Sequence, residues 1–243
     1  MKKLIGALPS GSLQQPCLEL WRSAGYRITV PECSFFPQID DPDIALLLLD
    51  PQEIHRYVAE GRLDFGICKV GFEYVQRVVT VAEFMFSKVS RHSTMWVVAA
   101  VPNDSAIKEP SDLAVEDIDT SWPGFRGEEC KKRESTSRFI ASPQAFADPW
   151  KKQKMEDIAL LLRATLDAEG KVGLMMNAKR SDCDAIVDLL PALHKPTTPS
   201  LSDPDWVSIS SIVDETVVRQ IIPALKRAGA EGIVEFPVSK LIR

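Results

Sequence analysis

A glycine and a serine directly after an apolar segment provide the first candidate for chemistry. Residues 3–8 are predicted to form a short buried strand, and Gly11 and Ser12 follow in the turn that leads into a helix. Backbone N–H groups at the start of a helix can hold a phosphate group. The alternative is a plain turn in which Ser12 caps the helix. The sequence leaves both interpretations open.

The second candidate is Asp64, which we place at the carboxyl end of a strand predicted within residues 63–68. Ligands in open α/β sheets bind outside the carboxyl ends of the strands, so Asp64 is a candidate substrate contact. The alternative is an exposed carboxylate at the edge of a loop. Glu53 is interpreted instead as a charge near a helix N-terminus, where the helix dipole favours it.

The cysteines and histidines indicate no metal or disulfide framework. There are five cysteines, an odd number, and no two are spaced as C-x-x-C. We therefore expect free thiols in a reducing cytoplasm, with neither a disulfide framework nor a thiolate zinc site. The three histidines are far apart in sequence, and His55 is expected at a solvated helix position.

Composition excludes several classes of protein. The chain has 243 residues, 45% of them hydrophobic and 26% charged, which is typical of a globular fold. The longest apolar run covers residues 44–49, whereas a membrane helix needs about 20 such residues. Pro9 interrupts the short apolar stretch near the N-terminus, so no secretory signal is expected. The net charge of −5 argues against a nucleic-acid-binding protein.

The first part of the chain shows the rhythm of an α/β fold. Residues 44–49 are uniformly apolar and predict a central parallel strand covered on both faces. A helix from Pro51 to about Gly61 and the strand predicted within residues 63–68 follow. This alternation predicts β-α-β units with right-handed crossovers. Apolar residues at helical spacing predict a long amphipathic helix over residues 150–169.

Beyond Gly170 the predicted order of elements is βαββαβ. The expected strands lie within residues 172–176, 197–201, 207–213 and 232–238, and the helices within residues 182–190 and 216–228. This is the order of the ferredoxin-like split unit.

Four segments of this last part resemble the C-terminal regulatory domain of long-form ATP phosphoribosyltransferases, which are enzymes of histidine biosynthesis. The matching words are LPALHKPT at 190–197, DWV at 205–207, LKRAGAEGI at 225–233 and PVSKL at 237–241. Their order and spacing both agree with the family. The resemblance implies an ACT-like regulatory domain over residues 170–243.

The N-terminal part is similar to the same family. The matching words are ALPSGSL at 7–13, PQEI at 51–54, YVAEG at 57–61, DFG at 64–66, FSK at 86–88, WVVAAVP at 96–102 and RFIASP at 138–143. The resemblance implies a bilobal, periplasmic-binding-protein-like catalytic part. Its first lobe is expected over residues 1–95 and 138–169, and a truncated second lobe over residues 96–137.

The resemblance breaks between residues 120 and 138, where the family carries the loop that holds the ribose 5-phosphate. Residues 121–137 are only 17 residues, dense in charge, whereas a strand, a phosphate loop and a helix need about 30. The family also has Lys where Ser10 stands, Arg where Asp50 stands and often a basic residue where Met95 stands. Charge-assisted bonds to phosphate contribute about 1.5–3 kcal/mol each, so these differences predict weaker binding of phosphorylated substrates.

The resemblance implies a reaction in which ATP and phosphoribosyl pyrophosphate give phosphoribosyl-ATP, with Mg²⁺ as cofactor and histidine as feedback inhibitor. Carried over to this sequence, the substrate and phosphate contacts are Gly11, Ser12 and Asp64, with Lys69 and Lys88 as compensating cations. The histidine contacts carried over are Asn177, Leu193, Thr197, Ile212 and Gly232. The family further implies a cytoplasmic homo-oligomer, a dimer or a hexamer, without nucleic-acid or membrane partners.

A second hypothesis remains open, because the phosphoribosyl loop is absent. The chain would then be a non-catalytic homologue that retains effector binding and oligomer contacts. A third hypothesis is an internal deletion that leaves the protein defective.

Overall fold

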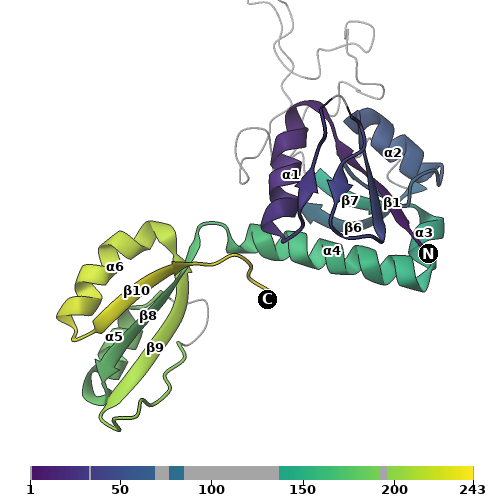
Figure 1. Ribbon diagram of the computed structural model, residues 1–243. Helices are drawn as coiled ribbons and strands as arrows, with labels where there is room; N and C mark the ends of the chain where they lie inside the picture. Colours follow the sequence, from purple (N-terminus) through teal and green to yellow (C-terminus); the bar gives the residue numbers. More distant parts are fainter. Residues whose placement is uncertain (1, 33, 69–76, 85–136, 192–195, 243) are drawn as a thin grey trace, which may run out of the picture. The chain divides into compact units, whose positions relative to one another are not determined.

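The computed structural model describes residues 2–32, 34–68, 77–84, 137–191 and 196–242 (Figure 1). The chain divides into two compact units, Met1–Arg163 and Ala164–Arg243. Each unit combines a β-sheet with helices, so the predicted α/β class is confirmed. Most of the second lobe expected over residues 96–137 lies outside the described residues.

The first unit is built on a five-stranded mixed sheet with the strand order β4-β1-β5-β7-β6. Its strands are β1 (Leu4–Pro9), β4 (Ile44–Leu49), β5 (Phe65–Cys68), β6 (Val79–Phe84) and β7 (Ser137–Ala141). Strand β1 pairs in parallel with both β4 and β5, whereas β7 pairs antiparallel with β5 and β6.

Strand β4 is an edge strand of this sheet, so the prediction of a central strand is wrong. Only its inner edge pairs with a named strand, β1, and its residues alternate between buried and half-buried. At its outer edge the Leu48 N–H donates to the carbonyl oxygen of Phe35 at 2.8 Å. The apolar run reflects cover on both faces of the strand. On one face Leu47 and Leu49 pack against the cluster that contains Ile54 and Val58 of the following helix. On the other face Ile44, Leu46 and Leu48 are buried. The two-residue strands β2 (Ile28–Thr29) and β3 (Gln38–Ile39) frame the loop that contains Phe35.

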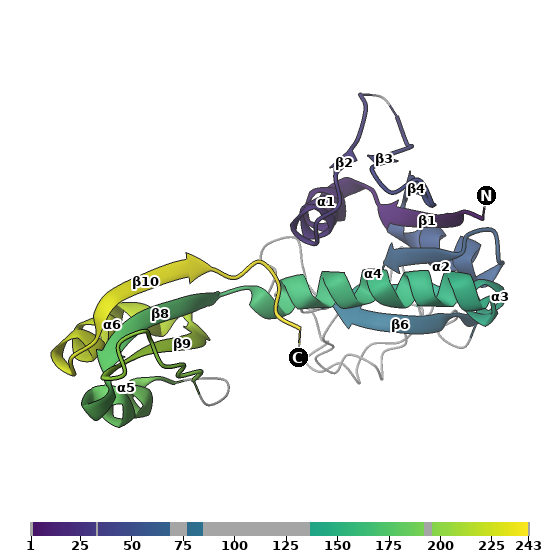
Figure 2. The ribbon, with the colours of Figure 1, turned by 60° about the horizontal axis from the view of Figure 1, so that its bottom comes forward.

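Helices α1 (Gln14–Ser23) and α2 (Pro51–Ala59) lie on opposite faces of the sheet. On one face Trp21 of α1 stacks on Phe65, which stacks on Phe139 with ring centroids 5.1 Å apart. On the other face a Cβ atom added to Gly66 would lie 2.2 Å from Ile54 of α2. The glycine therefore allows the close approach of α2. The short helix α3 (Pro143–Ala147) precedes α4 (Pro149–Ala168), the long amphipathic helix that the sequence predicts (Figure 2).

The starts of α1 and α2 differ in capping. Asp50 caps α2, because its carboxylate accepts the Gln52 N–H at 2.8 Å, and Pro51 occupies the first turn. The prediction that Ser12 caps α1 is wrong. Ser12 lies inside a 3₁₀ turn, Gly11–Leu13, and the residue preceding α1 is Leu13. His55 of α2 is buried rather than solvated, because it lies on the side of the helix that packs on the sheet.

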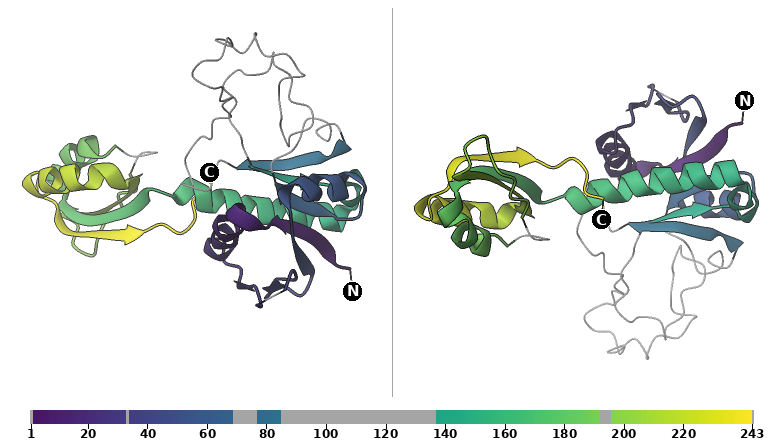
Figure 3. Two further views of the ribbon diagram at one scale, coloured as in Figure 1. Left: turned by 90° about the horizontal axis from the view of Figure 1, so that it is seen from above. Right: turned by 90° about the horizontal axis from the view of Figure 1, so that it is seen from below.

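The second unit has a three-stranded antiparallel sheet in the order β10-β8-β9, visible in Figure 3. Its strands are β8 (Lys171–Lys179), β9 (Trp206–Asp214) and β10 (Glu231–Pro237), and its helices are α5 (Cys183–Leu189) and α6 (Glu215–Arg227). The strand expected over residues 197–201 is reduced to two isolated bridges to β9, Thr197 with Ser210 and Ser200 with Val207. Three prolines at 196, 199 and 204 remove N–H donors that a longer strand requires.

The two helices cover one face of this sheet and leave the other face open. Alternate residues of β8, among them Leu174 and Met176, are fully buried in the core beneath α5 and α6. The residues between them, such as Met175 and Asn177, are exposed. This alternation is the expected pattern for an antiparallel sheet with one buried face.

Candidate ligand site

The parallel strands β1 and β4 finish side by side, and they bring Ser10 and Asp50 to the same end of the sheet. Pro9 pairs with Leu49, and the Ser10 N–H donates to the Leu49 carbonyl oxygen at 2.8 Å. Gly11 follows with a φ of +69°, which turns the chain into the 3₁₀ turn before α1. Gly11 and Ser12 are both exposed at this end. This arrangement places the predicted phosphate-binding turn at the carboxyl end of β1.

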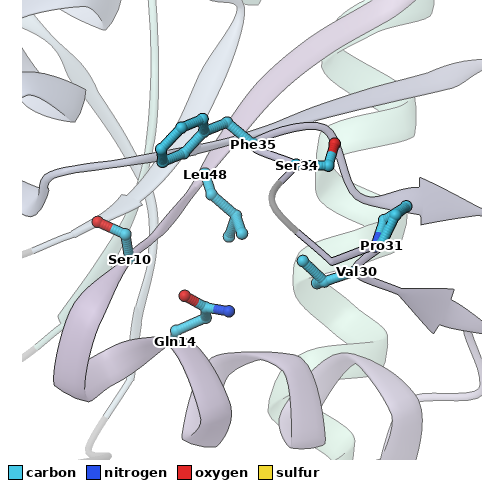
Figure 4. Close-up of a pocket in the computed structure, with 7 residues that line it drawn as sticks. All are labelled: Ser10, Gln14, Val30, Pro31, Ser34, Phe35 and Leu48. Atoms are coloured by element: carbon cyan, nitrogen blue, oxygen red, sulfur yellow. The ribbon is translucent and has the colours of Figure 1, made fainter.

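A cavity of about 440 Å³ opens beside this turn (Figure 4). The described residues that line it are Ser10, Gln14, Val30, Pro31, Ser34, Phe35 and Leu48. They come from the end of β1, the start of α1, the loop before β3 and the strand β4. Its volume lies within the range of small-molecule sites, about 300–1,000 Å³.

The described lining of the cavity carries no charge. Its polar groups are two hydroxyls and the carboxamide of Gln14, and its other side chains are apolar. Two carboxylates lie close to the lining in sequence: the exposed Glu32 directly follows Pro31, and Asp50, which caps α2, lies two residues after Leu48. The positions at which the resembled family has a lysine and an arginine, Ser10 and Asp50, therefore both lie at this end without a positive charge.

Asp64 does not belong to this site, and its placement at the carboxyl end of a strand is wrong. It directly precedes β5 and lies at the amino end of that strand. Its carboxylate accepts the Ile5 N–H at 2.8 Å and forms an ion pair of 2.6 Å with Lys151. Ile5 and Gly11 are six residues apart along β1 and its turn, which is roughly 20 Å at about 3.3 Å per residue. Asp64 therefore joins β1, β5 and α4 at the opposite end of the sheet, where β1 and β5 begin.

Four of the predicted effector residues lie on or beside the open face of the second unit. Asn177 pairs with Ser208, Ile212 with Gly173, and Thr197 with Ser210. Gly232 has a φ of +58°, and a Cβ atom added there would lie 3.9 Å from the Asn177 Nδ2. Asn177 and Gly232 are thus neighbours, whereas Ile212 lies four residues along β9 from Ser208, roughly 13 Å away. Lys69, Lys88 and Leu193 lie outside the described residues.

Comparison with known proteins decides the family. Residues 168–240 match the family described as "HisG, C-terminal domain". ATP phosphoribosyltransferase 1 of Geobacter sulfurreducens is 37% identical over an aligned stretch of 286 positions that covers 97% of each chain. The ATP phosphoribosyltransferases of Geotalea uraniireducens and Chlorobaculum parvum are each 36% identical, covering 97% of this chain and 97% and 96% of theirs. The chain belongs to the ATP phosphoribosyltransferase family.

A solved chain of the "ATP phosphoribosyl transferase (HisG:HisZ) complex from Thermotoga maritima" is 13% identical. It aligns with a TM-score of 0.39 and covers 68% of this chain and 98% of that chain, a likeness too low to compare arrangements. Within the described part of this ATP phosphoribosyltransferase-family chain, no helix is long and apolar enough to cross a membrane. No group of three or more His, Cys, Asp or Glu side chains able to hold a metal occurs among the described residues either.

Sequence patterns alone did not reveal several lining residues of the cavity. The loop at residues 31–42 reads only as rich in proline and aspartate, although its Phe35 forms one side of the cavity. The adjacent aromatic pair Phe35 and Phe36 is the signal in the sequence that could have pointed to this side of the cavity. Both rings are mostly exposed, at 68% and 65%.

The buried cysteines of this family member are not candidate nucleophiles. Burial raises the pKa of the Cys68 thiol to about 12, and it raises the pKa of the Cys17 thiol still further. The thiolate is the reactive form of cysteine, so both side chains stay protonated and unreactive at neutral pH.

We therefore expect iodoacetamide at pH 8 to leave Cys17 and Cys68 unmodified in the folded protein and to modify them after denaturation. The half-buried Cys183 provides the internal reference for partial exposure. Mass spectrometry of the digested protein reads each site separately. Rapid modification of Cys68 in the folded chain would contradict its burial within the sheet.

Proposed function

We propose that this chain catalyses the first step of histidine biosynthesis, in which ATP and phosphoribosyl pyrophosphate give phosphoribosyl-ATP and pyrophosphate. The observation that carries this proposal is the 36–37% identity to ATP phosphoribosyltransferases over nearly the full length of both chains. In this reaction N1 of the adenine attacks C1 of the ribose, and pyrophosphate leaves. The protein's task is to position the two substrates and to balance their charge.

The turn at the carboxyl end of β1 is proposed as a substrate-binding site. Its position agrees with the general location of ligands in open α/β sheets. Gly11 and Ser12 offer exposed backbone there, and the cavity beside them has the size of a small-molecule site. Lys69 and Lys88 stay proposed contacts to phosphate, as cations that compensate in part for those missing at Ser10 and Asp50.

Magnesium is proposed to bind together with the pyrophosphate group of the substrate. Mg²⁺ is commonly held by one or two carboxylates together with substrate phosphates. Asp64 is already bound to Lys151 and the Ile5 N–H, and the described residues contain no group of three or more His, Cys, Asp or Glu side chains able to hold a metal. No step is therefore assigned to a metal held by the described side chains.

We also propose a fold type for each of the two parts of the chain. In the second unit the strands and bridges are arranged as β10, β8, β9 and then residues 197–200. This order supports a ferredoxin-like, ACT-like regulatory domain over residues 170–243. The parallel β1, β4 and β5 with helices on both faces support the first lobe of a periplasmic-binding-like catalytic part over residues 1–95 and 138–169, with a truncated second lobe over residues 96–137.

A second candidate function is that of a non-catalytic homologue. The aligned stretch with the Geobacter sulfurreducens relative has 286 positions, 43 more than the 243 residues of this chain. At least that many positions of the alignment therefore lack a counterpart here. A missing phosphoribosyl loop would account for them, and Ser10 and Asp50 in place of two cations favour the same conclusion.

One assay separates the two functions. Purified protein is incubated with ATP, phosphoribosyl pyrophosphate and Mg²⁺, and the absorbance of the adduct is followed. The enzyme proposal predicts accumulation of phosphoribosyl-ATP that depends on both substrates. A complete lack of turnover in a folded sample would contradict it and leave the non-catalytic function. A relative such as the Geobacter sulfurreducens enzyme serves as the positive control.

Histidine is proposed to bind the second unit at Asn177, Leu193, Thr197, Ile212 and Gly232. The carboxamide of Asn177 can both donate and accept hydrogen bonds, and it lies beside Gly232 on an exposed surface. Thr197 is exposed in the segment bridged to β9, where its hydroxyl is not needed for the core. These features fit recognition of the amino and carboxylate groups of an amino acid.

Replacing Asn177→Ala is expected to weaken histidine binding about tenfold, which corresponds to losing one hydrogen bond to a charged group. Lys179→Ala is the matched control, since Lys179 is exposed two residues further along β8. Calorimetric titration of each variant with histidine measures the effect. Equal affinities in the wild type and Asn177→Ala would remove Asn177 from the proposed site.

The open sheet face is proposed to join copies of this chain in a homo-oligomer. Met175, Val234 and Phe236 are exposed to 45%, 47% and 44% on the strands β8 and β10. Val234 pairs with Met175, and the Phe236 ring covers Gly173. These side chains form a continuous apolar surface of the kind that marks contacts between proteins.

Val234→Glu is expected to shift the protein to a smaller species in analytical ultracentrifugation, because it introduces a charge into this apolar surface. Arg219→Glu, at an exposed position of α6 rather than on the sheet, is the control for a change of charge. An unchanged sedimentation coefficient for Val234→Glu would show that this face is not the contact between copies.

A further inference from the structure

The segment over residues 197–205, which runs beside β9, is not held in place by burial. All nine of its residues are exposed, and the prolines at 199 and 204 have no N–H to donate. Thr197 exchanges two backbone hydrogen bonds with Ser210, at 3.1 and 3.0 Å, and the Ser208 N–H donates to the Pro199 carbonyl oxygen at 2.9 Å. A segment with so little packing opens readily unless other bonds hold it.

Arg180 supplies such bonds to the second half of the segment. It directly follows β8, and its guanidinium donates from Nε to the Pro204 carbonyl oxygen at 3.1 Å and from Nη2 to the Ser200 hydroxyl at 2.9 Å. Its backbone N–H donates to the Asp205 carbonyl oxygen at 2.8 Å. A single side chain therefore joins two points of the turn that are four residues apart.

We propose that Arg180 is a positioning residue of the effector site, which holds residues 197–205 in the arrangement that binds histidine without contacting the ligand itself. Thr197, a proposed histidine contact, lies in this segment three residues before Ser200. If the segment is loosened, fewer molecules have Thr197 in place, and the apparent Kd rises in inverse proportion to that fraction. The inference rests on the proposed binding of histidine to the second unit.

The strand β8 relates this segment to the rest of the proposed site. Asn177, another proposed contact, lies on β8 three residues before Arg180 and pairs with Ser208 of β9. The Ser208 N–H in turn donates to the Pro199 carbonyl oxygen. The position of Thr197 relative to Asn177 therefore depends on β9 at one end of the segment and on Arg180 at the other.

The geometry of the donors, rather than the charge, is what this role requires. Both acceptors of the guanidinium are neutral oxygens, a carbonyl and a hydroxyl. The guanidinium presents its N–H groups in a rigid planar fork, whereas the ammonium of lysine is a point charge on a flexible stem. A lysine at position 180 would keep the charge and lose the paired contact.

Calorimetric titration of the full chain with histidine tests the effect on affinity. Arg180→Ala is expected to raise the Kd about fivefold, and Arg180→Lys is expected to restore little of that loss. Lys179→Ala, which removes the neighbouring exposed cation of β8, is the matched control and should bind as the wild type does. An unchanged Kd in Arg180→Ala, or complete rescue by Arg180→Lys, would overturn the proposal.

Ser200→Ala separates positioning from direct contact with the ligand. It removes one acceptor of the guanidinium while Arg180 itself stays in place. We expect it to weaken histidine binding too, and the double variant with Arg180→Ala to bind no more weakly than Arg180→Ala alone, because groups in one network are not additive. An affinity unchanged by Ser200→Ala, with the loss confined to Arg180→Ala, would instead indicate direct contact and overturn the proposal.

Hydrogen exchange of the free protein tests the positioning role without any ligand. The Leu201 and Trp206 amides, which bond within the turn to the carbonyl oxygens of Trp206 and Asp203, are expected to exchange about fivefold faster in Arg180→Ala. The amides of α6 should keep their protection and so report that the unit remains folded. Unchanged exchange at Leu201 and Trp206 would overturn the proposal whatever the titration shows.

The two measurements also distinguish this inference from the proposed effector function. A wild type that does not bind histidine would contradict the effector function, and faster exchange in Arg180→Ala would then still support the positioning of the segment by Arg180.

Discussion

The parallel pairing of β1 with β4 and β5 determines which side chains of the first unit can act together. It places Ser10 and Asp50 at the carboxyl end of these strands and Asp64 at their amino end. At the amino end, the Asp64 carboxylate joins the Ile5 N–H and Lys151, and its side chain is only 14% exposed. A paired carboxylate of this kind holds three elements in register. The proposed ligand site lies at the other end, where the strands β1 and β4 both finish beside the cavity.

Substitutions at this end distinguish the chain from the family it belongs to. A serine and an aspartate stand at two positions where the family resemblance leads us to expect cations. Asp50 has instead a structural role, since its carboxylate caps α2 and accepts the Gln52 N–H. The described residues at this end of the sheet thus provide a capped helix start and a carboxylate, and no cation.

Much of the fold follows from local patterns in the sequence. The strand at residues 44–49, the helix that begins at Pro51 and the long helix α4 all lie where periodicity and turn residues predict them. The order of strands within a sheet is set by long-range pairing, which a local pattern does not encode. For this reason β4 was expected in the centre and Asp64 at the wrong end of its strand. Capping by Ser12 failed for a local reason, because a 3₁₀ turn shifts the start of α1 to Gln14.

The candidate site was predictable only in part. The turn at Gly11 was identified from its position after an apolar strand, whereas Phe35 and Gln14 join it through tertiary contacts. The most direct test of the site is backbone NMR of the ¹⁵N-labelled protein titrated with ATP. The account predicts shifts concentrated at Ser10, Gln14, Ser34, Phe35 and Leu48, the described residues around the cavity. Shifts centred on Asp64 and Lys151 instead, at the opposite end of the sheet, would contradict it.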